Sequence, residues 1–381
     1  MGYFEEGINL IKILNSMGYS SFIVGGAVRD YLLNENFHDV DIATSALPDV
    51  LQSHFETKTK GIKYNCVEVL FNGYSFEVTT FRIDLDYEDY RHPRYMVANN
   101  LEADLRRRDF TINALALDQN LKLIDLFEGQ KDLDNHLVRA IGNPDIRFEE
   151  DALRILRAIY FASKLDFDIE KQTLEALGRQ AYLVQRLSFD RIREELSKIV
   201  LSKNQKRGFD YLLKTNVLSY LVNYEQGIKI IINNDLIIDN LLEFEAICFY
   251  KQNILNLENT LKKQLNDIYY LFEHDLTDPY ISFKYNINDI LLANKIRGYF
   301  GFKKQKEEQI KKTHDNLVIK HISELQINGN DIMQISNFKG KDIGFVLDDV
   351  LTKVLNHKIK NNHEDIKKYL LKRVRNYERK V

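Results

Sequence analysis

Two aspartates, Asp39 and Asp41, follow a glycine pair and an arginine near the start of the chain. In an extended strand alternate side chains share a face, so the two carboxylates are expected to point the same way. Carboxylates held this close repel each other unless a cation lies between them, and magnesium prefers oxygen ligands and bridges to phosphates. Gly25-Gly26 allows close approach of the backbone to a phosphate, and Arg29 adds a positive charge. The pattern predicts metal-dependent transfer of a nucleotide.

A third carboxylate is expected beside the aspartate pair. Glu77, in the strand-like segment Phe76–Thr80, is the strongest candidate, either for placing the metal or as the base that deprotonates an attacking hydroxyl. An outward-facing strand glutamate explains Glu77 equally well, and Glu68 is a weaker rival. A lone Asp-x-Asp or a lone glycine pair is common, so the prediction of catalysis rests on their combination with Arg29.

The composition limits the classes of protein that the chain can belong to. With 381 residues it is too long for one compact core, which predicts two to four domains. Only four prolines occur, which favours a largely helical chain because proline interrupts helices. The net charge of −3 gives no overall basic excess, so a nucleic-acid site would have to be a local patch.

The two cysteines, Cys66 and Cys248, lie far apart in apolar runs and are expected to be buried, reduced thiols. They offer neither a disulfide framework nor a zinc site. No apolar run is long enough to cross a membrane, and the acidic, amphipathic start does not resemble a signal peptide. The expectation is a cytoplasmic protein with no membrane partner.

The segment up to about residue 137 is predicted to mix strands and helices. The expected elements are strands at Ser21–Val24 and His38–Ala43, helices at Val28–Leu33 and from Pro48, and two hairpins, Cys66–Phe71 with Tyr74–Phe81 and Thr111–Leu117 with Leu121–Leu126. Asn72-Gly73 joins the strands of the first hairpin, and an Asn-Gly pair between β-rich runs is a strong hairpin signal.

After Pro144 apolar residues recur at helical spacing and strand signals fade. Helices are predicted at Arg147–Leu165 and at Ser188–Leu201, the latter with Ser188 as its N-cap. The chain from about residue 204 onward is predicted to be helical. Its last third carries local basic clusters, which fit a solvated helix face and an RNA-binding surface about equally well.

Seven ordered motifs resemble the class II tRNA nucleotidyltransferases, the family of the bacterial CCA-adding enzymes and their poly(A) polymerase relatives. They are GGAVRD, DVDIATSALP, FEVTTFR, LRRRDFTINALALD, IDLFEGQKDL, VRAIGNPDIRFEEDALRILRA and SFDRIREELSKIV. The resemblance is dense over roughly the first 200 residues and returns more loosely at INGNDIMQISNFKGKDIG. Small-molecule nucleotidyltransferases that share the glycine and Asp-x-Asp elements lack the RRDFTINA and EDALR segments.

The resemblance implies an α+β fold, with a polymerase β-like head built on a mixed sheet and all-α domains after it. The implied domains are a catalytic head at 1–137, a neck for base recognition at 138–202, a body at 203–300 and a tRNA-binding tail at 301–381. It implies that Asp39 and Asp41 hold two magnesium ions, one activating the primer hydroxyl and one neutralising the triphosphate. Gly26, Arg29 and Arg108 would contact the nucleotide, with Asn113 close by.

The segment Glu149–Leu165 carries the prediction for base selection. Asp151, Arg154 and Arg157 are spaced three apart, so on a continuous helix they share one side. Asp151 can accept a hydrogen bond from the exocyclic amine of cytosine or adenine, and Arg154 can donate to ring acceptors. Without the resemblance, an ion-paired surface helix explains this spacing better. The family usually has an arginine where this chain has Tyr160, which puts one nucleotide or phosphate contact in doubt.

The segment Phe81–Leu101 resembles a flexible loop that in this family helps the change from adding C to adding A. It is close to full length and keeps Asp89 and Arg91, which favours addition of complete CCA to the tRNA 3′ end and acceptor arm from CTP and ATP. The alternatives are a CC-adding, A-adding or poly(A)-adding relative, and a catalytically silent RNA-binding protein.

Overall fold

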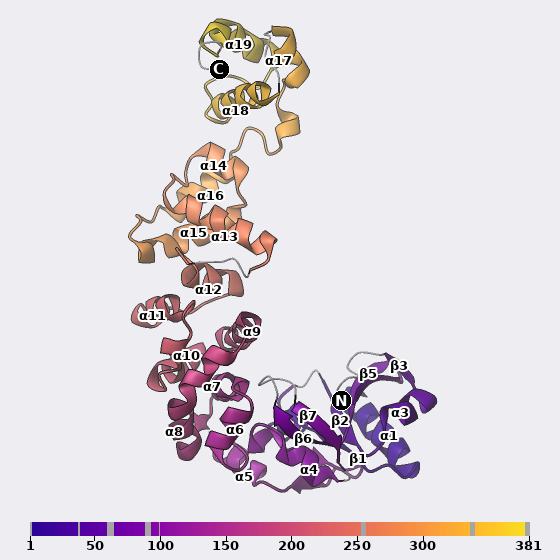
Figure 1. Ribbon diagram of the computed structural model, residues 1–381. Coiled ribbons are helices and arrows are strands. Elements are labelled where there is room, and N and C mark those ends of the chain that lie inside the picture. Colours follow the sequence, from indigo (N-terminus) through magenta and orange to yellow (C-terminus); the bar gives the residue numbers. More distant parts are fainter. Residues whose placement is uncertain are drawn as a thin grey trace. The chain divides into compact units, whose positions relative to one another are not determined.

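The computed structural model of the chain describes residues 2–36, 39–58, 65–87, 93–98, 100–252, 257–335 and 340–377. The chain divides into two compact units, Met1–Leu241 and Leu242–Val381. The first unit combines sheets with helices, whereas the described part of the second is helical (Figure 1). The α+β class expected from the sequence is confirmed.

A seven-stranded mixed sheet forms the centre of the first unit, in the order β3-β4-β5-β2-β1-β8-β9. Its strands are β1 Ser21–Val24, β2 Asp41–Thr44, β3 Glu56–Lys58, β4 Cys66–Phe71, β5 Tyr74–Thr80, β8 Leu115–Leu117 and β9 Leu123–Asp125. Strands β2 and β5 pair in parallel, and the other neighbours pair antiparallel. Two further pairs lie outside this sheet, β6 Arg82–Tyr87 with β7 Pro93–Val97 and β10 Leu137–Val138 with β11 Asp168–Ile169.

Helix α1 (Gly2–Ser16) covers one face of the sheet through buried Leu10, Ile11 and Leu14. It comes close enough that a Cβ on Gly7 would lie 3.0 Å from Val40 Cγ1 and 3.3 Å from Phe76 Cε1. A side chain at this crossing would require Val40 or Phe76 to shift, so a glycine suits the close packing of α1 on the sheet.

The other face of the sheet carries Val24, Ala43 and Phe81, which pack on Leu101 and Leu105 of α4 (Leu101–Arg106). Asp41 and Glu77 belong to this same face, because residues two apart in a strand project from the same side of the sheet.

The local predictions for the first segment hold with small differences. The Asn72-Gly73 hairpin forms, with φ of 48° at Asn72 and 82° at Gly73, and Pro48 occupies the first turn of α3 (Pro48–His54). The strand predicted at His38–Ala43 begins only at Asp41, and His38 lies outside the described residues. In the second hairpin, Thr111–Asn113 forms the 3-10 helix η2 and not strand, so β8 starts at Leu115.

The helical part of the first unit corrects one prediction that bears on the site. The helix expected over Arg147–Leu165 is broken into α6 (Pro144–Glu150) and α7 (Leu153–Leu165), with Asp151 extended at φ −142° and ψ 104°. Helix α9 (Phe189–Val200) begins as predicted, where the Ser188 side chain accepts a hydrogen bond from the Arg191 amide. The remaining helices are α2 Gly26–Leu32, α5 Gly129–Asp134, α8 Lys171–Gln180, η3 Ala181–Arg186, α10 Gln205–Lys214, η4 Val217–Tyr220 and α11 Glu225–Asn233.

In the described part of the second unit, helices pack around two apolar clusters. One is aromatic and centres on Phe272, with Tyr250 and Phe300 at ring-centroid distances of 5.3 and 5.5 Å. The other joins the last three helices through residues such as Val350 and Ile366. The helices are α12 Leu241–Cys248, α13 Asn259–Phe272, α14 Pro279–Lys284, α15 Ile287–Ile296, η5 Arg297–Phe300, α16 Glu307–Asp315, η6 Ile322–Glu324, α17 Gly329–Ile335, α18 Lys341–Leu355 and α19 His363–Tyr377.

Both cysteines are buried and unpaired, as the sequence predicts. Within the described ranges, no helix has the length and apolar character that crossing a membrane requires.

Candidate active site

Asp41 lies in a row of acidic residues that crosses three strands of the sheet. It is paired with Glu77 of β5, which is paired in turn with Glu68 of β4. Directly paired residues project from the same face, so the three carboxylates are neighbours on one surface. Asp39 precedes β2, is exposed, and lines the same cavity as Asp41 and Glu77.

The acidic row concentrates negative charge around Asp41. Burial and then the charge of Glu77 raise the pKa of Asp41 to about 6, with Asp39 acting in the same direction and Arg108 opposing them. A bound cation relieves such an excess of charge. Across the described ranges, no group of three or more His, Cys, Asp or Glu side chains is arranged to hold a metal ion. Magnesium needs only one or two carboxylates when phosphates and water complete its shell, so the donors fit magnesium arriving with a phosphate substrate.

Gly25 brings Arg108 close to the acidic row. Its φ is +75°, and a Cβ at this position would lie 2.9 Å from Arg108 Nη1 and 3.5 Å from Asp41 Oδ2. The glycine therefore leaves room for a guanidinium beside the carboxylate. Gly26 follows as the first residue of α2, and a Cβ there would make only an ordinary 3.5 Å contact with Arg29 Nη2.

Arg107 and Arg108 are held in place by a buried aspartate. Asp104 accepts hydrogen bonds from Arg107 Nη2 at 2.7 Å and from Arg108 Nη2 at 3.2 Å. Burial acts to raise the pKa of Asp104, but the charges of the two arginines hold this pKa below its usual value. This carboxylate therefore stays ionised and keeps both arginines oriented.

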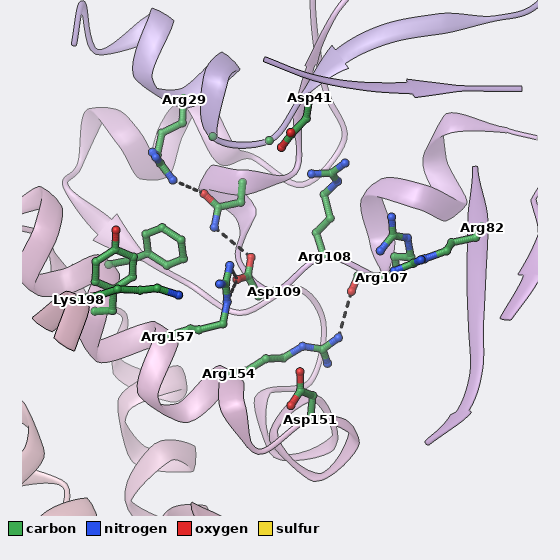
Figure 2. Close-up of a pocket in the computed structure, with 15 residues that line it drawn as sticks. Arg29, Asp41, Arg82, Arg107, Arg108, Asp109, Asp151, Arg154, Arg157 and Lys198 are labelled. Carbon is green, nitrogen blue, oxygen red and sulfur yellow. Dashed lines mark hydrogen bonds and ion pairs between the residues drawn. The ribbon is translucent and has the colours of Figure 1, made fainter. Parts of the chain in front are cut away.

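A chain of polar contacts joins α2 and η2 to α7. Arg29 Nη1 donates to Asn113 Oδ1 at 2.6 Å, Asn113 Nδ2 donates to Asp109 Oδ1 at 3.0 Å, and Arg157 Nε donates to Asp109 Oδ2 at 2.8 Å (Figure 2). The guanidinium carbons of Arg29 and Arg157 each lie 5.2 Å from the ring centroid of Phe161. Cation–π attraction therefore closes the chain into a ring.

Asp109 is the central acceptor of this ring. Burial acts to raise its pKa, but Arg157 and the hydrogen bonds from Asn113 and the Phe110 amide lower it to about 2. The Asp109 carboxylate is therefore ionised at neutral pH.

The break between α6 and α7 decides how Asp151 and Arg154 are presented. Asp151 Oδ1 accepts a hydrogen bond from the Leu153 amide at 3.0 Å and lies 3.8 Å from Arg191 Nη2. Arg154 donates to the carbonyl of Arg107 at 3.1 Å and to Glu150 Oε2 at 2.8 Å. The prediction that one helix aligns Asp151 with Arg154 and Arg157 is wrong, because Asp151 lies in the extended link. Asp151 and Arg154 nevertheless line the same cavity (Figure 2).

An arginine-lined cavity of about 520 Å³ unites these features. Every residue predicted to bind the nucleotide lines it: Gly25, Gly26, Arg29, Arg108, Asn113, Asp151, Arg154 and Arg157. The remaining lining residues are Asp41, Arg82, Arg107, Asp109, Tyr160, Phe161 and Lys198. The volume falls in the range of small-molecule sites.

A second, carboxylate-lined cavity of about 1030 Å³ lies next to the first. It contains Asp39 and Glu77 and shares four residues with the arginine-lined cavity: Asp41, Arg82, Arg107 and Arg108. The predicted loop residues Asp89 and Arg91 lie outside the described residues.

Several lining residues received no functional prediction. Arg107 and Asp109 flank Arg108 in the sequence, so their position alone was a usable signal. Phe161 and Lys198 follow ordinary helical patterns and gave none. Tyr160 lines the cavity at the position where the family resemblance predicts arginine. Lys198 of α9 also lines it, and its ammonium lies 2.8 Å from Glu195 Oε1.

Three family models match successive parts of the chain. Residues 21–139 match the Poly A polymerase head domain. Residues 166–224 match the probable RNA and SrmB-binding site of polymerase A, and residues 250–370 match the putative tRNA nucleotidyltransferase domain 2.

Curated relatives are similar over nearly the whole chain. A CCA-adding enzyme of Ligilactobacillus salivarius is 34% identical, covering 95% of this chain and 94% of the relative. A CCA-adding enzyme of Staphylococcus haemolyticus is 35% identical, covering 98% of each. Among solved structures, the Bacillus stearothermophilus CCA-adding enzyme in complex with CTP has a TM-score of 0.84 at 29% identity, covering all of both chains.

Proposed function

This chain belongs to the family of the CCA-adding enzymes, the class II tRNA nucleotidyltransferases, and we propose that it adds and repairs the 3′-terminal CCA of tRNA from CTP and ATP, releasing pyrophosphate. The observation that carries this proposal is the arginine-lined cavity, in which Asp41 lies at one end and the pair Asp151 and Arg154 at the other (Figure 2). A nucleoside triphosphate has the same order of groups, with phosphates at one end and a base at the other. A tRNA substrate also fits the cytoplasmic location expected from the sequence.

In this proposal Asp39 and Asp41 hold magnesium. When bound, two magnesium ions supply activation of the primer hydroxyl and neutralisation of the triphosphate and leaving pyrophosphate. The chain's own cations complete the charge balance. Arg108, which Asp104 orients next to Asp41, and Arg29 face the phosphates from two sides.

Glu77 is proposed as the general base. It is the direct neighbour of Asp41 across the β2–β5 pair and lines the carboxylate-lined cavity. A hydroxyl that attacks the α-phosphorus in line, from the side opposite to the leaving pyrophosphate, would therefore come within reach of a carboxylate.

Base choice is proposed to rest on Asp151 and Arg154. Cytosine and adenine offer an amine where uracil and guanine offer a carbonyl oxygen, and that oxygen would be repelled by the Asp151 carboxylate. Arg154 is 6% exposed and is held by the carbonyl of Arg107 and by Glu150, so little rotamer freedom is left to lose when a base binds. Loss of a required buried hydrogen bond can discriminate by about 10⁴-fold or more.

We also propose the division into a head at 1–137, a neck at 138–202, a body at 203–300 and a tail at 301–381. The ring through Arg29, Asn113, Asp109 and Arg157 supports a head and neck that act together, since it joins residues from both. Exposed lysines near the start of the tail are the proposed tRNA contacts: Lys303, Lys304, Lys306, Lys311 and Lys312.

The test is incorporation into three tRNA primers, ending before CCA, after C and after CC, with magnesium and either a single nucleoside triphosphate or CTP with ATP. With CTP and ATP together, the expected result is completion of CCA followed by a stop on every primer. With CTP alone, addition should stop at CC, and with ATP alone only the primer that ends after CC should be extended. Addition of C alone, A alone or a long A tract would assign the chain to one of the sister activities. Binding of tRNA with no incorporation would identify a catalytically silent RNA-binding protein.

A further inference from the structure

The carboxylate-lined cavity has aromatic side chains on its wall that the proposed chemistry does not use. Tyr3 of α1 and Tyr74 of β5 both line it, with ring centroids 5.2 Å apart and ring planes inclined by 20°. Tyr3 OH donates a hydrogen bond to the Ser75 carbonyl at 2.5 Å, which fixes the inner ring of the stack. Tyr74 remains 38% exposed, a large aromatic surface to leave in contact with water.

We propose that this cavity receives the unpaired 3′-terminal nucleotide of the RNA primer, and that Tyr74, supported by Tyr3, is the platform on which its base stacks. The inference rests on the proposed function and names the position of its second substrate. Aromatic side chains are the usual partners of unpaired RNA bases, because every base has a π-face to stack.

The direction of the reaction supports this assignment. In an in-line transfer the attacking hydroxyl and the leaving pyrophosphate lie on opposite sides of the α-phosphorus. The nucleotide and its pyrophosphate occupy the arginine-lined cavity, so the hydroxyl has to arrive from elsewhere. The carboxylate-lined cavity adjoins it at Asp41 and Arg108, where the proposed metal ligands and Glu77 lie.

The charges of the cavity fit a nucleotide whose sugar is directed inward. With Asp39 and Asp41 assigned to magnesium, Glu77 remains as a carboxylate that can accept a hydrogen bond from a ribose hydroxyl. Arg82 and Arg107 line the same cavity and can meet the phosphate of the RNA backbone.

The hairpin turn fixes where the aromatic platform stands. Gly73 has a φ of +82°, which favours glycine in this turn, and a Cβ at this position would meet nothing within 4 Å. Because Tyr74 pairs with Phe71 as the closing residue of the hairpin, its backbone is held in register. The platform therefore needs little rearrangement before a base binds.

Tyr31 of α2 provides a matched control in the same unit. Tyr31 is also 38% exposed and also stacks on a ring of α1, with its centroid 4.8 Å from that of Phe4. Tyr31 is absent from the residues that line either cavity. Removing its ring therefore matches the loss of aromatic area at Tyr74 without touching the proposed site.

The experiment compares Tyr74→Ala, Tyr74→Leu, Tyr74→Phe and Tyr31→Ala in the full chain, with CTP and a tRNA that ends before CCA. One stacked base is expected to account for about fivefold or more in kcat/KM for the primer, which Tyr74→Ala and Tyr74→Leu should lose. Tyr74→Phe keeps the ring and should retain this value, and Tyr31→Ala should resemble the wild type. The KM for CTP should stay within about twofold in all four variants.

A fluorescence measurement separates stacking from a structural effect. A primer carrying 2-aminopurine at its 3′ end should be quenched on binding to the wild type and to Tyr74→Phe, and remain bright with Tyr74→Leu, which keeps apolar bulk against Tyr3. An unchanged kcat/KM in Tyr74→Ala, or equal quenching by Tyr74→Leu, would overturn the proposal. A wild type that adds no nucleotide to any tRNA would instead contradict the proposed function.

Discussion

Replacing Gly25 by alanine tests how the backbone positions Arg108. With φ of +75° and ψ of −138°, Gly25 has a conformation that costs a residue with a side chain about 1–3 kcal/mol. The added Cβ would also lie 2.9 Å from Arg108 Nη1, closer than real Cβ contacts occur, so the guanidinium must shift from its present position. Gly25→Ala is therefore expected to reduce both stability and incorporation.

The expected stability loss can be measured by thermal unfolding followed by circular dichroism. For a unit of this size, about 1–3 kcal/mol corresponds to a fall of about 3–10 °C in the unfolding midpoint. Gly26→Ala is the matched control, because Gly26 begins α2 without a positive φ and its Cβ would lie 3.5 Å from Arg29 Nη2. Its effect on stability should stay within about 0.5 kcal/mol.

The effect on incorporation is expected to act through Arg108. If the displaced guanidinium is the cause, Gly25→Ala should lower kcat/KM for CTP in the wild type but add little in an Arg108→Ala background, where the clashing atom is absent. The stability loss should persist in that background, since the backbone strain remains. A Gly25→Ala variant as stable as Gly26→Ala, or one whose kinetic loss is undiminished without Arg108, would refute the reasoning.

Three further outcomes follow from the same site. Asp41→Ala should leave the circular dichroism spectrum unchanged and lower incorporation by about 10³-fold or more, because metal-supplied stabilisation is worth several kcal/mol; near-normal incorporation would contradict the metal mechanism. Asp151→Ala should raise incorporation of UMP and GMP relative to CMP, and an unchanged preference in single-nucleotide assays would count against base reading by Asp151. Asp109→Asn should lower the free energy of unfolding by about 2 kcal/mol at neutral pH, from the fall of the Asp109 pKa from 3.8 to about 2. A carboxylate whose pKa is lower in the folded state stabilises the fold above its unfolded-state pKa, and this stabilisation is lost as pH falls through the folded-state pKa of about 2. Denaturant titrations should therefore give a constant difference in unfolding free energy between the wild type and Asp109→Asn from pH 8 to 5, and the difference should narrow below about pH 4. A difference that instead shrinks between pH 8 and 6 would show that another group is responsible.

Local sequence patterns were enough to predict the elements that rest on local physics. The Asn72-Gly73 hairpin, the proline that opens α3 and the Ser188 cap all form as expected, since each depends on residues a few positions apart. The eight predicted nucleotide residues were likewise found together in one cavity, although their roles stay predictions. That prediction came from the order of the sequence motifs and not from local patterns, because the motifs lie in separate helices and strands.

By itself, the sequence determined the class of fold, the acidic pair with its glycine turn, and eight of the residues that gather in the arginine-lined cavity. Only the tertiary structure decided the break at Asp151, which helical spacing could not reveal because Asp151 is held by the Leu153 amide and lies near Arg191, 40 positions away in the chain. It also decided the ring around Phe161 and the aromatic stack of Tyr3 on Tyr74, both made by side chains distant in sequence. Periodicity reports which face of an element is buried, but the partners across that face are chosen when the elements pack.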